Sequence, residues 1–286
     1  MKLAFLFPGQ GAQYVGMGKD LYENYEEARK IYDKVEELLK LDVKKISFEV
    51  PEEVLNQTKN TQIAILTHSL SILEILKKYD INADILSGLS LGEYSALIYA
   101  GVLSFEDGVK IVRKRGELMQ DNVPEGTWKM AAIVGLEDEK VEELCKKVKS
   151  GFVVPANYNC PGQVVISGEE EAVKEAMEIA KSEGAKRAIE LQTSGPFHTA
   201  KLEKAAEKLK RELDKIDINT DFTKQIIRNI DSESYKKDDD IREILSKHVM
   251  SPVKFKKGIE KMLEEGVDTF VEIGPRKSIV RICKKN

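Results

Sequence analysis

Short apolar runs alternate with amphipathic segments through most of the chain. Residues 2–7 and 85–88 are mostly apolar, and a Pro-Gly pair or a glycine ends each run, which is typical of short buried strands. Apolar residues recur every three or four positions in residues 61–78 and 105–120, as in helices that bury one face. This alternation predicts a mostly parallel sheet with helices packed against it.

The middle of the chain shows a different order of elements. After a Pro-Gly hinge near residue 125, the pattern predicts strand, helix, strand, strand, helix and strand, the order of a ferredoxin-like split βαβ unit. We expect these six elements at residues 128–134, 137–148, 152–157, 163–167, 169–183 and 186–191.

Strand–helix alternation resumes beyond this unit, with strands expected at residues 226–230 and 269–273. We therefore predict an α/β fold in two parts. A large domain of residues 1–125 and 193–286 carries the mostly parallel sheet, and a small ferredoxin-like domain of residues 126–192 is inserted into it.

Charge and cysteine content narrow the classes of function. The formal net charge of −4 gives no reason to expect a nucleic acid or an anionic membrane as a partner. No apolar run is long enough to span a bilayer, and the N-terminal run lacks the length and cleavage site of a signal peptide. The three cysteines are scattered without the spacing of metal ligands. We expect a cytoplasmic protein with reduced thiols and no metal.

The segment Gly88-Leu89-Ser90-Leu91-Gly92 lies between the second predicted strand and a predicted helix. This G-x-S-x-G pattern places a serine on a sharp turn, where glycines let the backbone bend and approach its neighbours closely. The Ser90 hydroxyl then stands at the start of a helix, whose N–H groups and dipole favour a developing negative charge. The pattern alone is a weak signal, because a turn of small residues before a helix is also common.

Arg115 is a charge on an apolar helix face. Val112 precedes it by three residues and Met119 follows it by four, so the guanidinium shares their face. Burying a guanidinium without an anion is costly. Two explanations stay open: an internal salt bridge, or a substrate carboxylate that the planar fork holds through two hydrogen bonds.

His198 is the histidine placed best for proton transfer. It follows Gly195-Pro196-Phe197 in a turn just before a predicted helix, and catalytic histidines favour such rigidly held loop positions. A surface or helix-capping role is the alternative. His68 lies at the edge of an apolar helix stripe, where a structural role is expected.

Taken together, these segments resemble the malonyl-CoA:acyl-carrier-protein transacylases, the acyltransferases that load malonyl groups in fatty acid synthesis. The resemblance extends over nearly the whole chain and rests on seven motifs in order, each of them weak alone. The motifs are FPGQGAQ (residues 7–13), GLSLGEYSAL (88–97), RKRG (113–116), NYNCPGQVVISG (157–168), GPFH (195–198), SPV (251–253) and EIGP (272–275).

This resemblance implies an α/β hydrolase-like large domain and a ferredoxin-like small domain, with the active site between them. It assigns the nucleophile to Ser90, the base to His198 and the carboxylate-binding arginine to Arg115. It assigns the oxyanion hole to the backbone N–H groups of Gln10 and Leu91. The implied substrates are malonyl-CoA and acyl carrier protein, with no metal or bound cofactor, and we expect a monomer.

Two residues depart from the family pattern. Leu89 stands where a histidine often precedes the nucleophile, and we expect only a change in pocket polarity. His248 stands where the family usually has a glutamine whose backbone carbonyl orients the catalytic histidine. Because a backbone role survives a change of side chain, we expect the His248 carbonyl to orient His198. A second imidazole near the site is the alternative.

Two other functions share these motifs. A serine hydrolase, such as an esterase or thioesterase, would use the same serine and histidine with an acid from between them in the chain, but it leaves Arg115 without a purpose. A carrier-binding protein without catalysis would keep the fold and form no acyl-enzyme.

The carrier protein is acidic in this family, which implies a basic docking surface. Two groups are candidates: Lys110, Arg113 and Lys114, or Arg276, Lys277, Lys284 and Lys285.

Overall fold

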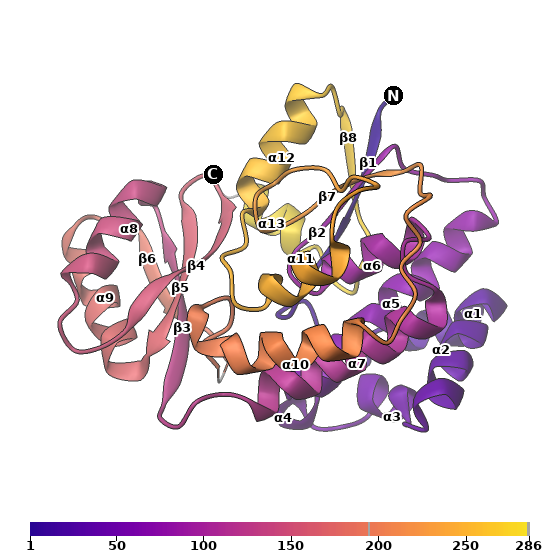
Figure 1. Ribbon diagram of the computed structural model, residues 1–286, viewed down its shortest axis with the longest axis horizontal. Helices are drawn as coiled ribbons and strands as arrows, with labels where there is room; N and C mark the ends of the chain where they lie inside the picture. The colour runs from indigo at the N-terminus through magenta and orange to yellow at the C-terminus, as the bar shows by residue number, and fades with distance from the viewer. Residues whose placement is uncertain (194, 285–286) are drawn as a thin grey trace.

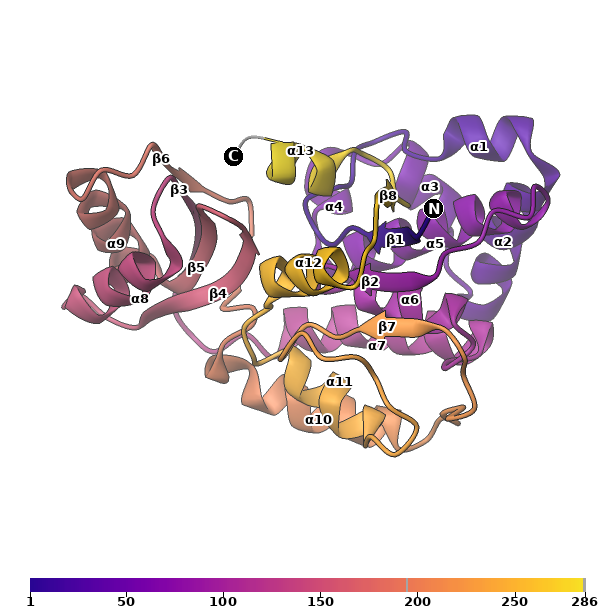
Figure 2. The same cartoon turned by 90° about the horizontal axis from the view of Figure 1, so that it is seen from above.

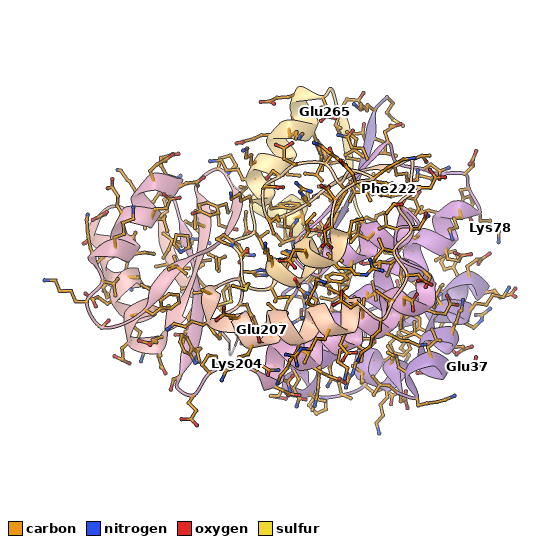
Figure 3. The ribbon with its side chains drawn as sticks, viewed as in Figure 1. Glu37, Lys78, Lys204, Glu207, Phe222 and Glu265 are labelled. Atoms are coloured by element: carbon orange, nitrogen blue, oxygen red, sulfur yellow. The ribbon has the colours of Figure 1, made fainter. Side chains whose placement is uncertain are left out.

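The structure, a computed structural model, describes residues 1–193 and 195–284, which form two four-stranded sheets flanked by helices (Figure 1). The two sheets lie beside each other in both views (Figures 1 and 2). Charged side chains such as Glu37 and Lys78 extend outward at the rim (Figure 3), whereas the apolar residues of the predicted strands are buried. Within the described residues, no helix has the length and apolarity needed to cross a membrane.

The first sheet is parallel throughout, with the strand order β7-β2-β1-β8. Its strands are β1 (Leu3–Phe7), β2 (Ile85–Gly88), β7 (Gln225–Ile227) and β8 (Thr269–Glu272). β1 lies between β2 and β8, so that Phe7 is opposite Gly88. The apolar runs at residues 2–7 and 85–88 are therefore the two central strands, and the predicted parallel sheet is confirmed.

Helices cover both faces of this sheet (Figure 2). Phe5 and Phe7 belong to the larger core, which the helices α2, α5, α6, α7 and α10 complete, while Ala4 and Leu6 point into a smaller core under α12. Because successive side chains of a strand point to opposite faces, a strand covered on both sides needs a continuous apolar run. The helices of this part are α1 (Lys19–Asn24), α2 (Glu26–Leu39), α3 (Val43–Phe48), α4 (Glu52–Leu55), α5 (Thr58–Lys77), α6 (Gly92–Tyr99), α7 (Phe105–Asp121), α10 (Glu203–Leu213), α11 (Ile241–His248), α12 (Phe255–Glu264) and α13 (Ser278–Lys284).

The second sheet is antiparallel, with the strand order β4-β5-β3-β6. The predicted sequence of six elements is present, as β3 (Trp128–Val134), α8 (Asp138–Lys147), β4 (Val153–Cys160), β5 (Gln163–Glu169), α9 (Glu170–Ser182) and β6 (Arg187–Glu190). α8 and α9 cover one face and enclose a separate apolar core. All four strands lie within residues 126–192, the predicted insert, although the exact domain boundary stays a prediction.

Two predicted strands have different limits in the structure, and one predicted helix is more deeply buried than expected. β4 continues to Cys160 because Gly162, with φ of +71°, lets the chain reverse within two residues. The strand predicted for residues 226–230 ends at Ile227, and the chain then turns toward the end of β2. α5 is buried nearly all round, since it packs between α2, α6 and α7, so His68 is buried and does not lie at the edge of a stripe.

The second sheet meets the first part of the molecule along β4. The Tyr158 N–H donates to the Val253 carbonyl (2.8 Å), and the Val253 N–H donates to the Ala156 carbonyl (2.8 Å). The face of this sheet that α8 and α9 leave uncovered contributes Met130 and Val165 to a cleft of about 540 Å³. The other wall of the cleft comes from the ends of β1 and β2, so the cleft lies between the two sheets.

Candidate active site

Ser90 sits on a constrained turn at the end of β2. Its φ of +54° lies in the left-handed region, which a residue with a Cβ adopts only where its surroundings hold it there. The flanking glycines make the turn possible, because a Cβ on Gly92 would overlap the Phe7 carbonyl oxygen and one on Gly88 would overlap the Gly92 backbone. The predicted strand, turn and helix are therefore present, and Ser90 lines the cleft.

His198 reaches Ser90 from a loop 108 positions further along the chain. Its Nε2 lies 2.8 Å from Ser90 Oγ, and its Nδ1 lies 3.0 Å from the His248 carbonyl oxygen. A carbonyl oxygen can only accept, so Nδ1 carries a proton and Nε2 of the neutral ring accepts a hydrogen bond from the Ser90 hydroxyl. Burial, reinforced by the positive charge of Arg115, lowers the pKa of His198 to about 4. The ring is therefore neutral at neutral pH.

Arg115 is fully enclosed and has no acidic partner in contact. Its side chain is 1% exposed; Nη2 donates to Ser90 Oγ (3.0 Å), and Nη1 donates to Gln62 Oε1 (2.7 Å). Nε has no partner in the described residues, and no carboxylate among them forms an ion pair with this guanidinium. Burial lowers the pKa of Arg115 from its ordinary value, while Tyr94 and Glu93 oppose the shift. The internal salt bridge considered from the sequence is thus not seen.

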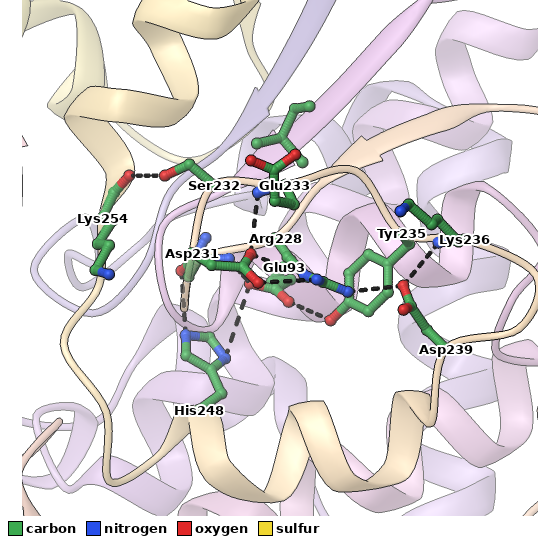
Figure 4. Close-up of polar contacts among 12 residues, drawn as sticks. Glu93, Arg228, Asp231, Ser232, Glu233, Tyr235, Lys236, Asp239, His248 and Lys254 are labelled. Carbon is green, nitrogen blue, oxygen red and sulfur yellow. Dashed lines mark hydrogen bonds and ion pairs between the residues drawn. The ribbon is translucent and has the colours of Figure 1, made fainter.

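A buried polar network joins the serine turn to His248. Figure 4 shows Glu93, Tyr235 and His248, which belong to this network. Asn229 Oδ1 accepts from the Ser90 N–H (2.7 Å) and lies 3.1 Å from His248 Nε2. Glu93 accepts from the Asn229 N–H (2.8 Å) and from the Tyr235 hydroxyl. Burial raises the pKa of Glu93 to about 7 and lowers that of His248 well below its ordinary value. The His248 imidazole therefore contacts Asn229, and the His248 backbone carbonyl accepts a hydrogen bond from Nδ1 of His198.

Gln10 and Leu91 both line the cleft that Ser90 lines. Gln10 follows β1 in the glycine-rich loop, and Leu91 is the residue before α6. Among the described residues, neither backbone N–H donates to another acceptor. The turn itself is close-packed, since a Cβ on Gly9 would overlap the Leu89 carbonyl oxygen. Two residues of the cleft therefore have a backbone N–H without an acceptor in the described part of the chain. No group of His, Cys, Asp and Glu suited to a metal ion occurs in the described part of the chain.

Comparison with known proteins identifies the family. The acyl transferase domain family matches residues 4–286. The malonyl CoA-acyl carrier protein transacylase of Bacillus subtilis (strain 168) is 47% identical over 286 residues, which cover 99% of this chain and 90% of that protein. This chain belongs to the malonyl CoA-acyl carrier protein transacylase family. The predicted membership of a family of malonyltransferase enzymes is confirmed.

Solved transacylases share the fold. The transacylase of Clostridium perfringens is 49% identical and has a TM-score of 0.94, with 100% of this chain and 90% of that chain covered. A malonyl-transacylase solved in complex with a type II PKS acyl-carrier protein is 37% identical and has a TM-score of 0.95, with 99% and 92% covered. The α/β fold with one parallel and one antiparallel sheet therefore agrees with transacylase structures.

Sequence reasoning missed three polar residues that support the site of this transacylase. Gln62 contacts Arg115 from inside α5, and its only signal was an amide within an apolar helix. Asn229 lies inside the strand predicted for residues 226–230, where asparagine is uncommon, and its presence there indicates that the strand ends earlier. Glu93 is completely buried, and the apolar residues around it in the chain were the sign.

Proposed function

We propose that this transacylase moves a malonyl group from coenzyme A to the phosphopantetheine thiol of acyl carrier protein through a malonyl ester on Ser90. One observation supports this most: a neutral imidazole and a guanidinium without an acidic partner both reach the same serine oxygen. His198 Nε2 lies 2.8 Å and Arg115 Nη2 lies 3.0 Å from Ser90 Oγ. The first group suits proton transfer to and from the serine, and the second suits a carboxylate on the acyl group.

Ser90 and His198 carry out the bond-making steps. As Ser90 Oγ attacks the thioester carbonyl, His198 Nε2 takes the hydroxyl proton and the carbonyl becomes a tetrahedral oxyanion. The C–S bond then breaks, and His198 returns the proton to the sulfur of coenzyme A. The thiol of the carrier protein attacks the malonyl ester with the same proton transfers in reverse order. The His248 carbonyl keeps the proton on Nδ1 throughout, so that Nε2 always faces the serine.

The backbone N–H groups of Gln10 and Leu91 form the oxyanion hole in this proposal. Both residues line the cleft together with Ser90, and neither N–H has an acceptor among the described residues. The Leu91 N–H stands at the start of α6, where the helix dipole adds to the attraction of a negative charge. Loss of one such donor typically raises the barrier by about 3 kcal/mol.

Arg115 selects an acyl group with a carboxylate. The guanidinium is buried and charged, and it contacts three groups without a negative charge: the Gln62 amide, the Ser90 hydroxyl and the Tyr94 ring. Malonyl supplies the missing anion at one end and the thioester carbonyl at the other. The malonyl carboxylate also offsets the positive charge of Arg115, which helps to lower the pKa of His198. Binding of malonyl therefore raises the pKa of His198 toward the working pH.

A serine hydrolase is the alternative, and the acceptor decides between the two. The test is to supply malonyl-CoA, methylmalonyl-CoA or acetyl-CoA together with a carrier protein, and to measure acyl carrier protein and free acid in parallel. We expect carrier protein that bears a malonyl group in large excess over free malonate, and little transfer of acetyl groups to the carrier protein. Free acid as the main product would make the chain a hydrolase, and the absence of any acyl-enzyme would make it a non-catalytic carrier-binding protein.

Of the two candidate surfaces for the acidic carrier protein, the C-terminal one borders the cleft. Arg276 lines the cleft and stacks on Tyr14, with its guanidinium 5.0 Å from the ring centre. The neighbouring Lys277 is exposed. On α7, Arg113 and Lys114 are both paired with Glu117. We therefore propose docking at Arg276 and Lys277; the side chain of Lys284 and all of Lys285 lie outside the described residues.

The architecture fits the same proposal. We assign an α/β hydrolase-like large domain to residues 1–125 and 193–286, and a ferredoxin-like small domain to residues 126–192. The parallel order β7-β2-β1-β8 and the serine turn after β2 support the first assignment, and the antiparallel order β4-β5-β3-β6 supports the second. The monomeric state stays a prediction, which sedimentation of the purified chain would test.

A further inference from the structure

Asn229 is a buried residue whose polar groups all serve the serine turn or its surroundings. It lies two residues beyond β7 and is 1% exposed. Its backbone N–H donates to Glu93 Oε2 (2.8 Å), and its backbone carbonyl accepts from the Lys254 N–H (2.8 Å). The backbone is therefore fixed on both sides, and the side chain extends from a rigid base.

The Asn229 amide spans the turn that carries the nucleophile. Oδ1 accepts from the Ser90 N–H (2.7 Å), and Nδ2 donates to the Gly88 carbonyl (2.7 Å). Because a backbone N–H can only donate and a carbonyl can only accept, these two bonds fix the orientation of the amide. The amide thus bridges the residues on either side of Leu89 and holds Ser90 at its positive φ of +54°.

The same amide oxygen also contacts the segment that orients the base. His248 Nε2 lies 3.1 Å from Asn229 Oδ1, and since that oxygen accepts, Nε2 carries the proton. The carbonyl of His248 in turn holds Nδ1 of His198 (3.0 Å). Figure 4 shows the His248 ring beside Glu93. One side-chain oxygen is therefore two hydrogen bonds from the imidazole that faces Ser90 Oγ.

The geometry points to Asn229 as a positioning residue that fixes Ser90 and His198 relative to each other, by bonding the serine turn and the His248 side chain at one atom. This inference rests on the proposed Ser90–His198 chemistry. A 1 Å displacement of a reacting group costs about 100-fold in rate, so the loss of this link should appear in the acylation step. A purely structural Asn229 would affect only the fraction of folded protein.

The test is a double-mutant cycle of Asn229→Ala and His248→Ala, with Ser232→Ala as the matched control. Ser232 is buried in the same loop and also has a positive φ, but its hydroxyl donates to the Lys254 carbonyl (2.7 Å) and does not contact the turn. Single-turnover malonylation of Ser90 is measured by intact mass at several malonyl-CoA concentrations. Near-ultraviolet circular dichroism gives the folded fraction to which each rate is normalised.

We expect Asn229→Ala to lower the acylation rate about 100-fold at an unchanged half-saturating concentration, because binding contacts stay in place. His248→Ala should lower it less, and the double variant should be no slower than Asn229→Ala, since both changes break the same link. Ser232→Ala should acylate at the wild-type rate. If Asn229→Ala does not fold, Asn229→Asp takes its place, because it keeps the acceptor but sets an oxygen against the Gly88 carbonyl; we expect about a tenfold loss.

Two results would overturn the inference. One is a normalised rate within threefold of wild type for Asn229→Ala or its aspartate substitute. The other is a double variant whose loss is the product of the two single losses, which would mean that the residues act independently. Failure of the wild-type protein to form any malonyl-Ser90 is a separate outcome, and it would remove the proposed function on which the inference rests.

Discussion

Replacing Arg115 by methionine should separate folding from acyl selection. The change removes a buried guanidinium without an acidic partner. Even for buried ion pairs, replacement by apolar groups is often neutral or stabilising by about 1–4 kcal/mol. It also leaves Gln62 Oε1 without its donor, which costs about 1–3 kcal/mol. These two effects have opposite signs, so we expect the free energy of unfolding to change by less than about 3 kcal/mol.

The effect on malonyl transfer should be much larger. Leaving one partner of a buried charge pair alone costs about 3–5 kcal/mol, so the malonyl carboxylate without Arg115 should slow acylation roughly 100- to 5,000-fold. Acetyl-CoA has no carboxylate to leave unpaired. Acetyl transfer should therefore be unchanged or faster, also because loss of the nearby positive charge removes one cause of the lowered pKa of His198.

The assay is single-turnover acylation with malonyl-CoA and with acetyl-CoA, followed by intact mass, together with urea unfolding. Arg113→Met is the matched control, since this guanidinium lies on the same helix but is bound to Glu117 (2.8 Å) and does not line the cleft. It should leave the preference for malonyl unchanged. An equal loss for both acyl groups in Arg115→Met, or malonyl acylation within tenfold of wild type, would refute the role given to Arg115.

Three further predictions concern the same site. The rate constant kcat/KM should stay level from neutral pH and fall only as pH drops through about 4, where His198 takes up a proton; a fall centred near the ordinary histidine value of about 6.5 would contradict this. Burial lowers the pKa of both His68 and His198 to about 4. Between about pH 6.5 and pH 4, the unfolded chain therefore binds more protons at these two residues than the folded chain does. Their contribution to the free energy of unfolding is present above about pH 6.5 and is lost toward pH 4. His68→Leu should therefore reduce the slope of the free energy of unfolding against pH, measured by urea titrations in this range, by the equivalent of up to one proton. An unchanged slope would count against a neutral His68. Gln62→Glu should place a carboxylate against Arg115 in competition with malonyl, raising KM for malonyl-CoA at least tenfold without affecting acetyl-CoA; equal KM values for malonyl-CoA in the variant and the wild type would refute it.

The sequence predicted the elements whose pattern is local. The apolar runs of β1 and β2 and the glycines around Ser90 require only neighbouring residues, and they have the expected structure. The order of elements in the second sheet was also predicted. Arg115 stood out because helical periodicity placed its charge on a buried face, and its side chain is 1% exposed.

The supporting residues could not be predicted, because their roles depend on contacts distant in the chain. Asn229 contacts Ser90 across 139 positions, and only the parallel pairing of β7 with β2 brings them together. Gln62 reaches Arg115 across 53 positions, between two packed helices. Periodicity describes one helix face at a time, so it could not show that α5 is buried nearly all round.

In the proposed reaction, Ser90 carries the malonyl group between two thiols. The most direct measurement is peptide mass spectrometry of the protein mixed with malonyl-CoA and digested at acidic pH, for the wild type and for Ser90→Ala. We expect one malonyl group on the peptide that contains Ser90, its loss on addition of carrier-protein thiol, and no adduct in Ser90→Ala. A malonyl group on another residue, or full transfer to the carrier protein by Ser90→Ala, would rule out this role of Ser90.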